Sequence, residues 1–73
     1  MLSSEIGSPV TGTVWKVERA VGDVLEEGDV IMILESMKME IPVQADAPGR
    51  LEALHVDEGE SVSEDQILCV VRA

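Results

Sequence analysis

The sequence predicts an all-β fold: a flattened barrel (sandwich) of two four-stranded antiparallel sheets related by pseudo-twofold symmetry. Three observations predict this fold. The composition is aliphatic, glycines and prolines are closely spaced, and the chain repeats an apolar pattern after 37 residues. Hydrophobic residues make up 45% of the 73 residues, with one Trp and no Phe or Tyr. The core must therefore be aliphatic, and many Val and Ile residues favour strands over helices.

Glycine and proline divide the chain into short segments. They occur at positions 7, 9, 12, 22, 28, 42, 48, 49 and 59. Only the intervals 29–41 and 60–73 could hold a helix of ordinary length, and each contains an apolar run too dense for one amphipathic face. The segments are therefore predicted to be strands and turns.

The internal repeat supports the same fold. A shift of 37 residues places Gly12 on Gly49 and Gly22 on Gly59, and apolar positions then coincide to the end of the chain. Two similar halves of this size imply a pseudo-symmetric domain with one shared core. The linking segment 35–40 has no counterpart in the second half.

The repeat predicts four strands in each half. The first set is 3–6, 13–18, 24–25 and 30–35, and the second is 39–44, 50–56, 61–62 and 67–72. Apolar residues in 13–18 and 50–56 are three positions apart, which indicates a bulge common to both halves because a regular strand alternates with period two. The residues expected to be mostly buried are Val14, Val17, Ile31, Ile33, Leu51, Leu54, Leu68 and Val70.

The segment from Glu35 to Glu40 is predicted to be the tip of a hairpin. Apolar runs flank it on both sides, and Met37-Lys38 would form a two-residue loop with Glu35 opposite Glu40. A type I′ turn needs positive φ at both loop residues, so Asn-Gly is the usual choice and Met-Lys is unfavourable. The Met-Lys loop and the like-charge pair of Glu35 and Glu40 are both locally unfavourable. Several unfavourable residue choices at one place are typical of a functional site.

The charge and the single cysteine exclude some function classes. The net charge of −10 argues against binding to nucleic acid or to anionic membranes, and favours partners with basic surfaces. A solvated acidic face is an equally simple interpretation. No apolar run is long enough to span a membrane, and Met1 to Ser4 does not resemble a signal peptide. One cysteine cannot form an internal disulfide, so a cytoplasmic location is expected.

The hairpin sequence between two quasi-repeats resembles the biotinyl/lipoyl attachment domain over nearly the whole chain. The resemblance depends on Met37-Lys38-Met39 with a small residue, Ser36, before it. Further matching features are Pro9 with Gly12, Gly22-Asp23, Glu27-Gly28-Asp29 and Pro48-Gly49. The first half lacks the protruding insertion of some carriers. Residues 1–73 therefore resemble most a stand-alone attachment protein of the biotin carboxyl carrier type, or else the biotin domain of a larger carboxylase or decarboxylase.

The resemblance implies a carrier without catalytic or metal-binding residues. Lys38 would receive biotin from a biotin protein ligase, with Met37 and Met39 beside the attachment site. The candidate ligase-recognition residues are Glu35, Ser36 and Glu40. The further partners implied are a biotin carboxylase and a carboxyltransferase, and the isolated chain would be a monomer.

Two alternatives remain open in the sequence. Lipoyl domains usually carry Asp-Lys-Ala where this chain has Met-Lys-Met, so lipoate is the alternative cofactor on Lys38; an unmodified acidic interaction module is the third possibility. Lys16 lies inside a predicted strand, which is a poor place for a mobile arm. His55 is alone, Cys69 is expected in the core, and Trp15 could either cover its sheet or contact a partner.

Overall fold

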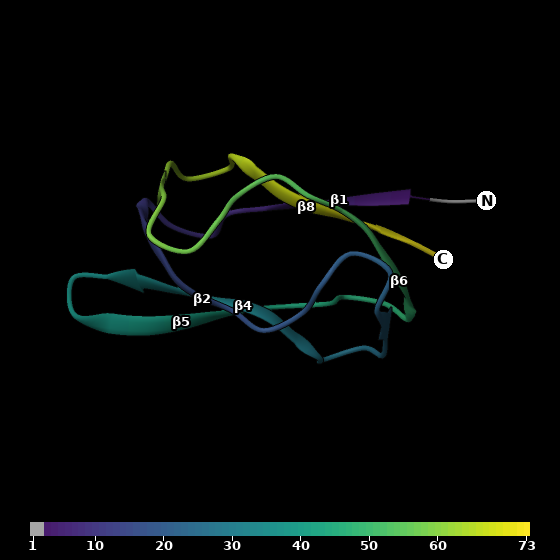
Figure 1. The fold of residues 1–73 in the computed structure, drawn as a ribbon. Helices are drawn as coiled ribbons and strands as arrows, with labels where there is room; N and C mark the ends of the chain where they lie inside the picture. Colours follow the sequence, from purple (N-terminus) through teal and green to yellow (C-terminus); the bar gives the residue numbers. More distant parts are fainter. Residues whose placement is uncertain (1–2) are drawn as a thin grey trace.

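The computed structural model describes residues 3–73, and these form two antiparallel sheets packed face to face (Figure 1). The strands are β1 (Ser3–Gly7), β2 (Gly12–Val17), β3 (Val24–Leu25), β4 (Val30–Ser36), β5 (Met39–Gln44), β6 (Gly49–Leu54), β7 (Ser61–Val62) and β8 (Ile67–Arg72). One sheet has the order β1-β8-β6-β3 and the other β5-β4-β2-β7. The molecule is elongated, 36 × 17 × 17 Å, with the β4–β5 hairpin at one end (Figure 1). The predicted all-β sandwich is confirmed.

Each sheet contains strands from both halves of the repeat. The 37-residue shift converts β1, β8, β6 and β3 into β5, β4, β2 and β7, so it exchanges the two sheets. Backbone hydrogen bonds recur in the same way: Gly22 N donates to Leu51 O at 2.8 Å, and Gly59 N donates to Val14 O at 2.7 Å. The predicted pseudo-twofold relation is therefore confirmed, and the halves share one core because each four-stranded sheet takes two strands from each half.

The predicted bulge is present in both halves. On β2, Trp15 and Lys16 together face Ile33 of β4, so one residue is added between Val14 and Val17. This addition lets Val14 and Val17 reach the same core, although Val17 is only half-buried. The equivalent bulge consists of Glu52 and Ala53 opposite Val70. Both strands end earlier than predicted, at Val17 and Leu54, where the chain leaves for the next turn.

A second pair of bulges corrects the predicted inward face of the long strands. Ile31 and Met32 of β4 together face Val43 of β5, and all three side chains are buried. Two successive residues therefore point inward, and the alternation that follows turns Ile33 outward and Leu34 inward. Leu68 and Cys69 form the equivalent bulge opposite Ile6. Ile33 and Val70 were expected in the core, but they lie on the outer faces of their sheets and are only partly buried there.

The core between the sheets is aliphatic, as predicted. Its buried members are Val14, Leu25, Ile31, Met32, Leu34, Val43, Ala45, Leu51, Val56, Val62, Leu68, Cys69 and Val71. Leu34 is completely buried four positions before the turn residue Lys38. The core thus anchors the base of the hairpin and leaves its tip outside.

Candidate functional site

The hairpin tip has the predicted two-residue turn. Ser36 and Met39 are the last paired residues of β4 and β5, and Met37 and Lys38 connect them. Their φ angles are 52° and 65°, so both occupy the left-handed region required of a type I′ loop. This region is unfavourable for side chains other than Gly, Asn or Asp. The turn is therefore locally strained at the lysine, and the paired strands on either side maintain it.

The base of the hairpin is fixed to the body of the domain. The Ser36 hydroxyl donates a hydrogen bond of 2.9 Å to the Thr11 carbonyl oxygen. Just beyond Thr11, Gly12 lies so close to the hairpin that an added Cβ would overlap the Glu35 carbonyl oxygen. Only glycine fits at this approach. The hairpin strands are consequently held in one position relative to β2.

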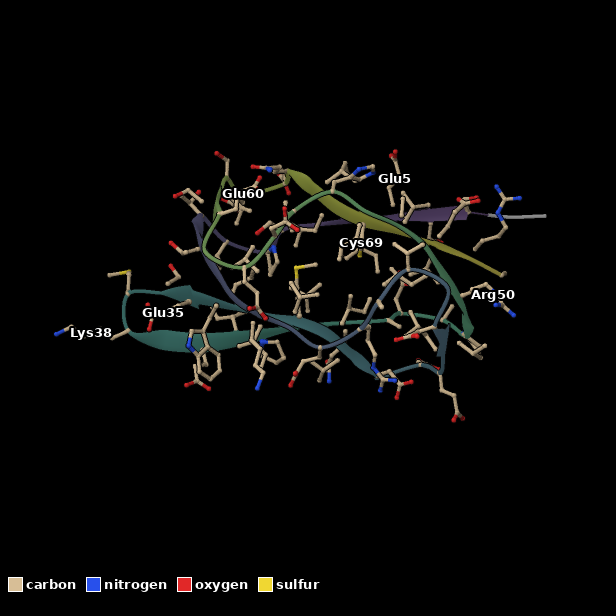
Figure 2. The ribbon with its side chains drawn as sticks, viewed as in Figure 1. Glu5, Glu35, Lys38, Arg50, Glu60 and Cys69 are labelled. Carbon is tan, nitrogen blue, oxygen red and sulfur yellow. The ribbon has the colours of Figure 1, made fainter. Side chains whose placement is uncertain are left out.

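The side chains of the tip are open to solvent. Met37 is 92% exposed and Met39 is 63% exposed, while Lys38 between them is also exposed. Figure 2 shows Lys38 projecting from the end of the molecule, away from both sheets. The ion pairs among residues 3–73 join Arg19 to Asp29 and Arg72 to Glu52, so neither uses the lysine. The Lys38 amine is thus accessible to a partner.

The three predicted recognition residues lie next to this tip but in different settings. Glu35 and Glu40 are directly paired across β4 and β5 and both are exposed, which places two like charges side by side. Ser36 holds the hairpin against Thr11, which gives it a structural role. Recognition of these residues by a ligase stays a prediction.

The remaining candidates are separate from the tip. Lys16 lies on the outer bulge of β2, beside Trp15, which is 50% exposed. Cys69 is buried in the core, and burial raises the pKa of its thiol to about 11, so the thiol is protonated and unreactive at neutral pH. His55 is exposed, and residues 3–73 contain no group of three or more His, Cys, Asp or Glu side chains that could hold a metal.

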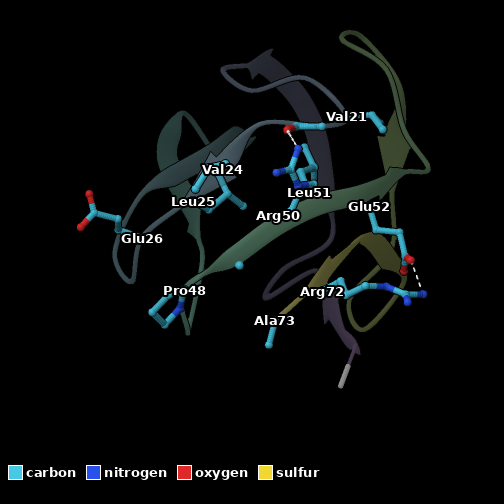
Figure 3. Close-up of a pocket in the computed structure, with 12 residues that line it drawn as sticks. Val21, Val24, Leu25, Glu26, Pro48, Arg50, Leu51, Glu52, Arg72 and Ala73 are labelled. Carbon is cyan, nitrogen blue, oxygen red and sulfur yellow. Dashed lines mark hydrogen bonds and ion pairs between the residues drawn. The ribbon is translucent and has the colours of Figure 1, made fainter. Parts of the chain in front are cut away.

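An open groove of about 650 Å³ lies near the opposite end of the sandwich, where β8 ends (Figure 3). Its walls are largely apolar and include Val21, Val24 and Pro48. Its two arginines are already engaged: Arg50 donates to the Gly22 carbonyl oxygen at 3.1 Å, and Arg72 pairs with Glu52. The groove was not predicted from the sequence. None of the residues that line it is a Ser, Thr, Cys, Lys or His that could act as a nucleophile.

The exposed lysine turn on a pseudo-symmetric sandwich defines a class of protein, the attachment domains that carry a group on one lysine. A family model described as "Biotin-requiring enzyme", the biotin/lipoyl attachment domain, matches residues 1–71. The chain belongs to this family.

Individual relatives agree with the family assignment. The chain is 44% identical over 59 residues to the "Biotin/lipoyl attachment protein" of Bacillus subtilis (strain 168), covering 81% of each chain. It is 35% identical over 69 residues to the "Pyruvate carboxylase" of Aspergillus niger, covering 94% of this chain and 6% of that one. Among solved structures, the Kluyveromyces lactis urea carboxylase is similar with a TM-score of 0.92 and 32% identity, covering 99% of this chain and 6% of that chain. The chain thus matches most of a small attachment protein and a minor part of large carboxylases.

Proposed function

We propose that residues 1–73 act as one carrier domain in which Lys38 is covalently biotinylated and serves a biotin-dependent carboxylase. The observation that carries the proposal is the Lys38 amine, exposed on a strained turn between two exposed methionines. Membership in the biotin/lipoyl attachment family supports it. The Met-Lys-Met sequence favours biotin over lipoate, since the Asp-Lys-Ala of lipoyl domains is absent.

The bond-forming step of attachment uses one reactive group of this chain, the Lys38 amine. The deprotonated Lys38 amine attacks the acyl carbon of biotinyl-adenylate, an amide C–N bond forms, the acyl–phosphate C–O bond breaks, and AMP leaves while the amine loses a proton. A ligase that has already consumed ATP supplies the activated acyl group. When bound, biotin supplies a ureido nitrogen that accepts and releases a carboxyl group. The domain contributes the position of the amine and no acid, base or metal.

The carrier contributes to carboxylation through tethering. A group linked to Lys38 has a high effective concentration at any active site within its reach. The Ser36–Thr11 hydrogen bond and the buried base of the hairpin hold the attachment point still, so mobility is confined to the lysine and its attached arm. Catalysis therefore belongs to the partners.

The partners proposed are a biotin protein ligase, a biotin carboxylase and a carboxyltransferase. Similarity to segments of pyruvate carboxylase and urea carboxylase supports the carboxylase components. No helix within residues 3–73 is long and apolar enough to cross a membrane. We further propose a monomer in the cytoplasm, where ATP is available to the ligase; the free, buried Cys69 is compatible with a reducing compartment.

Intact mass spectrometry after incubation with biotin, ATP and a biotin ligase tests the proposal. The expected result is a gain of one biotin mass, complete loss of that gain in Lys38→Arg, and an unchanged gain in Lys16→Arg. Lys16→Arg is a matched control because it changes the other lysine of the chain. Biotin on Lys38→Arg would show that the site is wrong. If protein isolated from its host carries lipoate and no biotin, the cofactor of this domain is lipoate and the proposal of biotin is wrong.

A further inference from the structure

An apolar row crosses the outer face of the sheet that carries the hairpin. Ile33 of β4 pairs with Pro42 of β5 on one side and faces the Trp15–Lys16 bulge of β2 on the other. Directly opposed residues of neighbouring antiparallel strands share one face of a sheet. Ile33 points outward, so Trp15 and Pro42 are on that outer face with it. We call Trp15, Ile33 and Pro42 the Trp15 row.

The fold itself does not require this row. The pseudo-twofold relation places Glu52, Val70 and Glu5 at the equivalent positions of the other sheet, with the same bulge and the same pairing. The same backbone conformation thus accepts Glu52 at the position of Trp15 and Glu5 at the position of Pro42. Trp15 is 50% exposed and lies outside the buried core, and tryptophan is among the commonest anchors of protein interfaces. The row is better explained by binding than by folding.

One cation and three carboxylates border the row: Lys16 directly faces Ile33, and Glu35, Glu40 and Glu58 lie on the two sides. Glu35 and Glu40 form the next outward pair toward the turn, and Glu35 lies at the Lys38 end of the molecule in Figure 2. On the far side of β2, the Glu58 carboxylate accepts a hydrogen bond of 2.9 Å from Val17 N. An apolar centre with an acidic rim is complementary to a partner with an apolar pocket and a basic rim.

The row is close enough to the attachment lysine for one partner to contact both. Ile33 is five residues before Lys38 on the same strand and turn, so the two residues are at most about 17 Å apart at roughly 3.3 Å per residue. A standard interface buries about 800 Å² per partner, a patch of about 16 Å radius. One interface, about 32 Å across, is therefore wide enough to include both Lys38 and the row.

The partner that must approach Lys38 most closely is the enzyme that acylates it. Before modification the reactive atom is the lysine amine itself, so the active site has to enclose the turn. After modification the added arm carries the reactive atom away from the domain, and later partners need not contact the sheet. We propose, building on the proposed biotinylation of Lys38, that the Trp15 row is the docking surface for the biotin protein ligase, which supplies an apolar pocket within a basic surface.

Steady-state biotinylation kinetics with the carrier as variable substrate test the docking surface. Trp15→Glu copies the residue that the other sheet uses at the same bulge, so the variant should fold. It should raise KM for the carrier at least tenfold and change kcat less than twofold, since Lys38 and the turn are untouched. The matched control is Val24→Ser, which removes a valine that is 67% exposed on the other sheet and copies its equivalent, Ser61; its KM should equal that of the wild type.

Several outcomes would overturn the docking proposal while leaving the proposed function intact. An unchanged KM in Trp15→Glu is one. A normal KM with slower carboxylation of the biotinylated variant is another, because it would assign the row to the carboxylase. If Trp15→Glu does not fold, Pro42→Glu, which copies Glu5, takes its place with the same expected rise in KM. A wild-type chain that accepts no biotin at all would instead contradict the proposed function itself.

Discussion

The two sheets of this protein share one backbone plan but carry different surfaces. Each has four strands in equivalent order, an inward bulge on its long strand and an outward bulge on the strand beside it. In the hairpin sheet the long strand continues through Met37-Lys38 into β5. In the other sheet Ser3 pairs with Arg72, which is the equivalent of the Glu40–Glu35 pair, and β1 and β8 are not consecutive strands of one hairpin.

This comparison separates what the fold needs from what the function uses. Features present in both sheets, such as the bulges, the buried aliphatic residues and the close approaches at Gly12 and Gly49, belong to the scaffold. The lysine turn and the Trp15 row are present in one sheet only. Because the other sheet folds without them, the fold does not require them. The pseudo-symmetry thus provides an internal control, and the predictions below use it.

The largest expected effect is a loss of stability at the two equivalent glycines that lie against a neighbouring backbone, Gly12 and Gly49. A Cβ at Gly12 would overlap the Glu35 carbonyl oxygen, and one at Gly49 would overlap the Arg72 carbonyl oxygen. Because the obstacle is backbone in both cases, Gly12→Ala and Gly49→Ala should each lower the free energy of unfolding by about 2–4 kcal/mol. Chemical denaturation of both variants measures this loss. A cost confined to Gly12→Ala would mean that the two sheets are not equivalent scaffolds.

The next effect concerns Cys69, which occupies the position equivalent to Met32. Burial raises the pKa of the Cys69 thiol from 9.0 to about 11 in the folded chain. The unfolded chain releases this proton first, so its thiol contributes stability that is fully present below pH 9 and is lost as the pH rises through 11. The loss is about 2–3 kcal/mol, because each pKa unit corresponds to about 1.4 kcal/mol.

Denaturation curves between pH 7 and pH 11 would measure this contribution. Cys69→Ala lowers stability at pH 7 because a small cavity forms, but it removes the thiol titration and should flatten the alkaline slope. Equal slopes for the wild type and Cys69→Ala would contradict a buried, protonated thiol.

A smaller effect is expected at the strained turn. Lys38 has a φ of 65°, and replacing it by glycine removes the steric cost of the left-handed region, so Lys38→Gly should leave stability unchanged or raise it by about 0.5–1 kcal/mol. Asp65 has a φ of 70° where the first half has Gly28, and because Asp tolerates the left-handed region better than Lys, Asp65→Gly should gain less than Lys38→Gly. Thermal unfolding compares the two. A marked loss in Lys38→Gly alone would show that the lysine stabilises the fold.

The smallest expected effect on stability accompanies a change in specificity. Replacing Met37 by Asp and Met39 by Ala gives the turn sequence usual in lipoyl domains. Both methionines are largely exposed, so the double variant should unfold within about 0.5 kcal/mol of the wild type while its modification shifts from biotin toward lipoate. Competition between the two ligases, read by mass, measures the shift. An unfolded double variant would place the methionines in the core.

The sequence alone determined the hairpin and the repeat. A link of two residues between two apolar runs leaves one simple register, so the pairing of Glu35 with Glu40 and the positive φ of Met37 and Lys38 followed from the sequence. The 37-residue spacing of Gly12 and Gly49 likewise predicted two equivalent halves. These features depend on contacts between near neighbours in the chain or on backbone geometry that specific residues require.

Only the tertiary structure decided which side of each long strand is buried. Five consecutive apolar residues do not distinguish two faces, and the extra residue at Ile31 reverses the alternation that would have buried Ile33. For the same reason the outward direction of Trp15 became clear only when its bulge was seen opposite Ile33. Burial is settled jointly by all the strands that share the core, so it depends on pairings between residues that are far apart in the sequence.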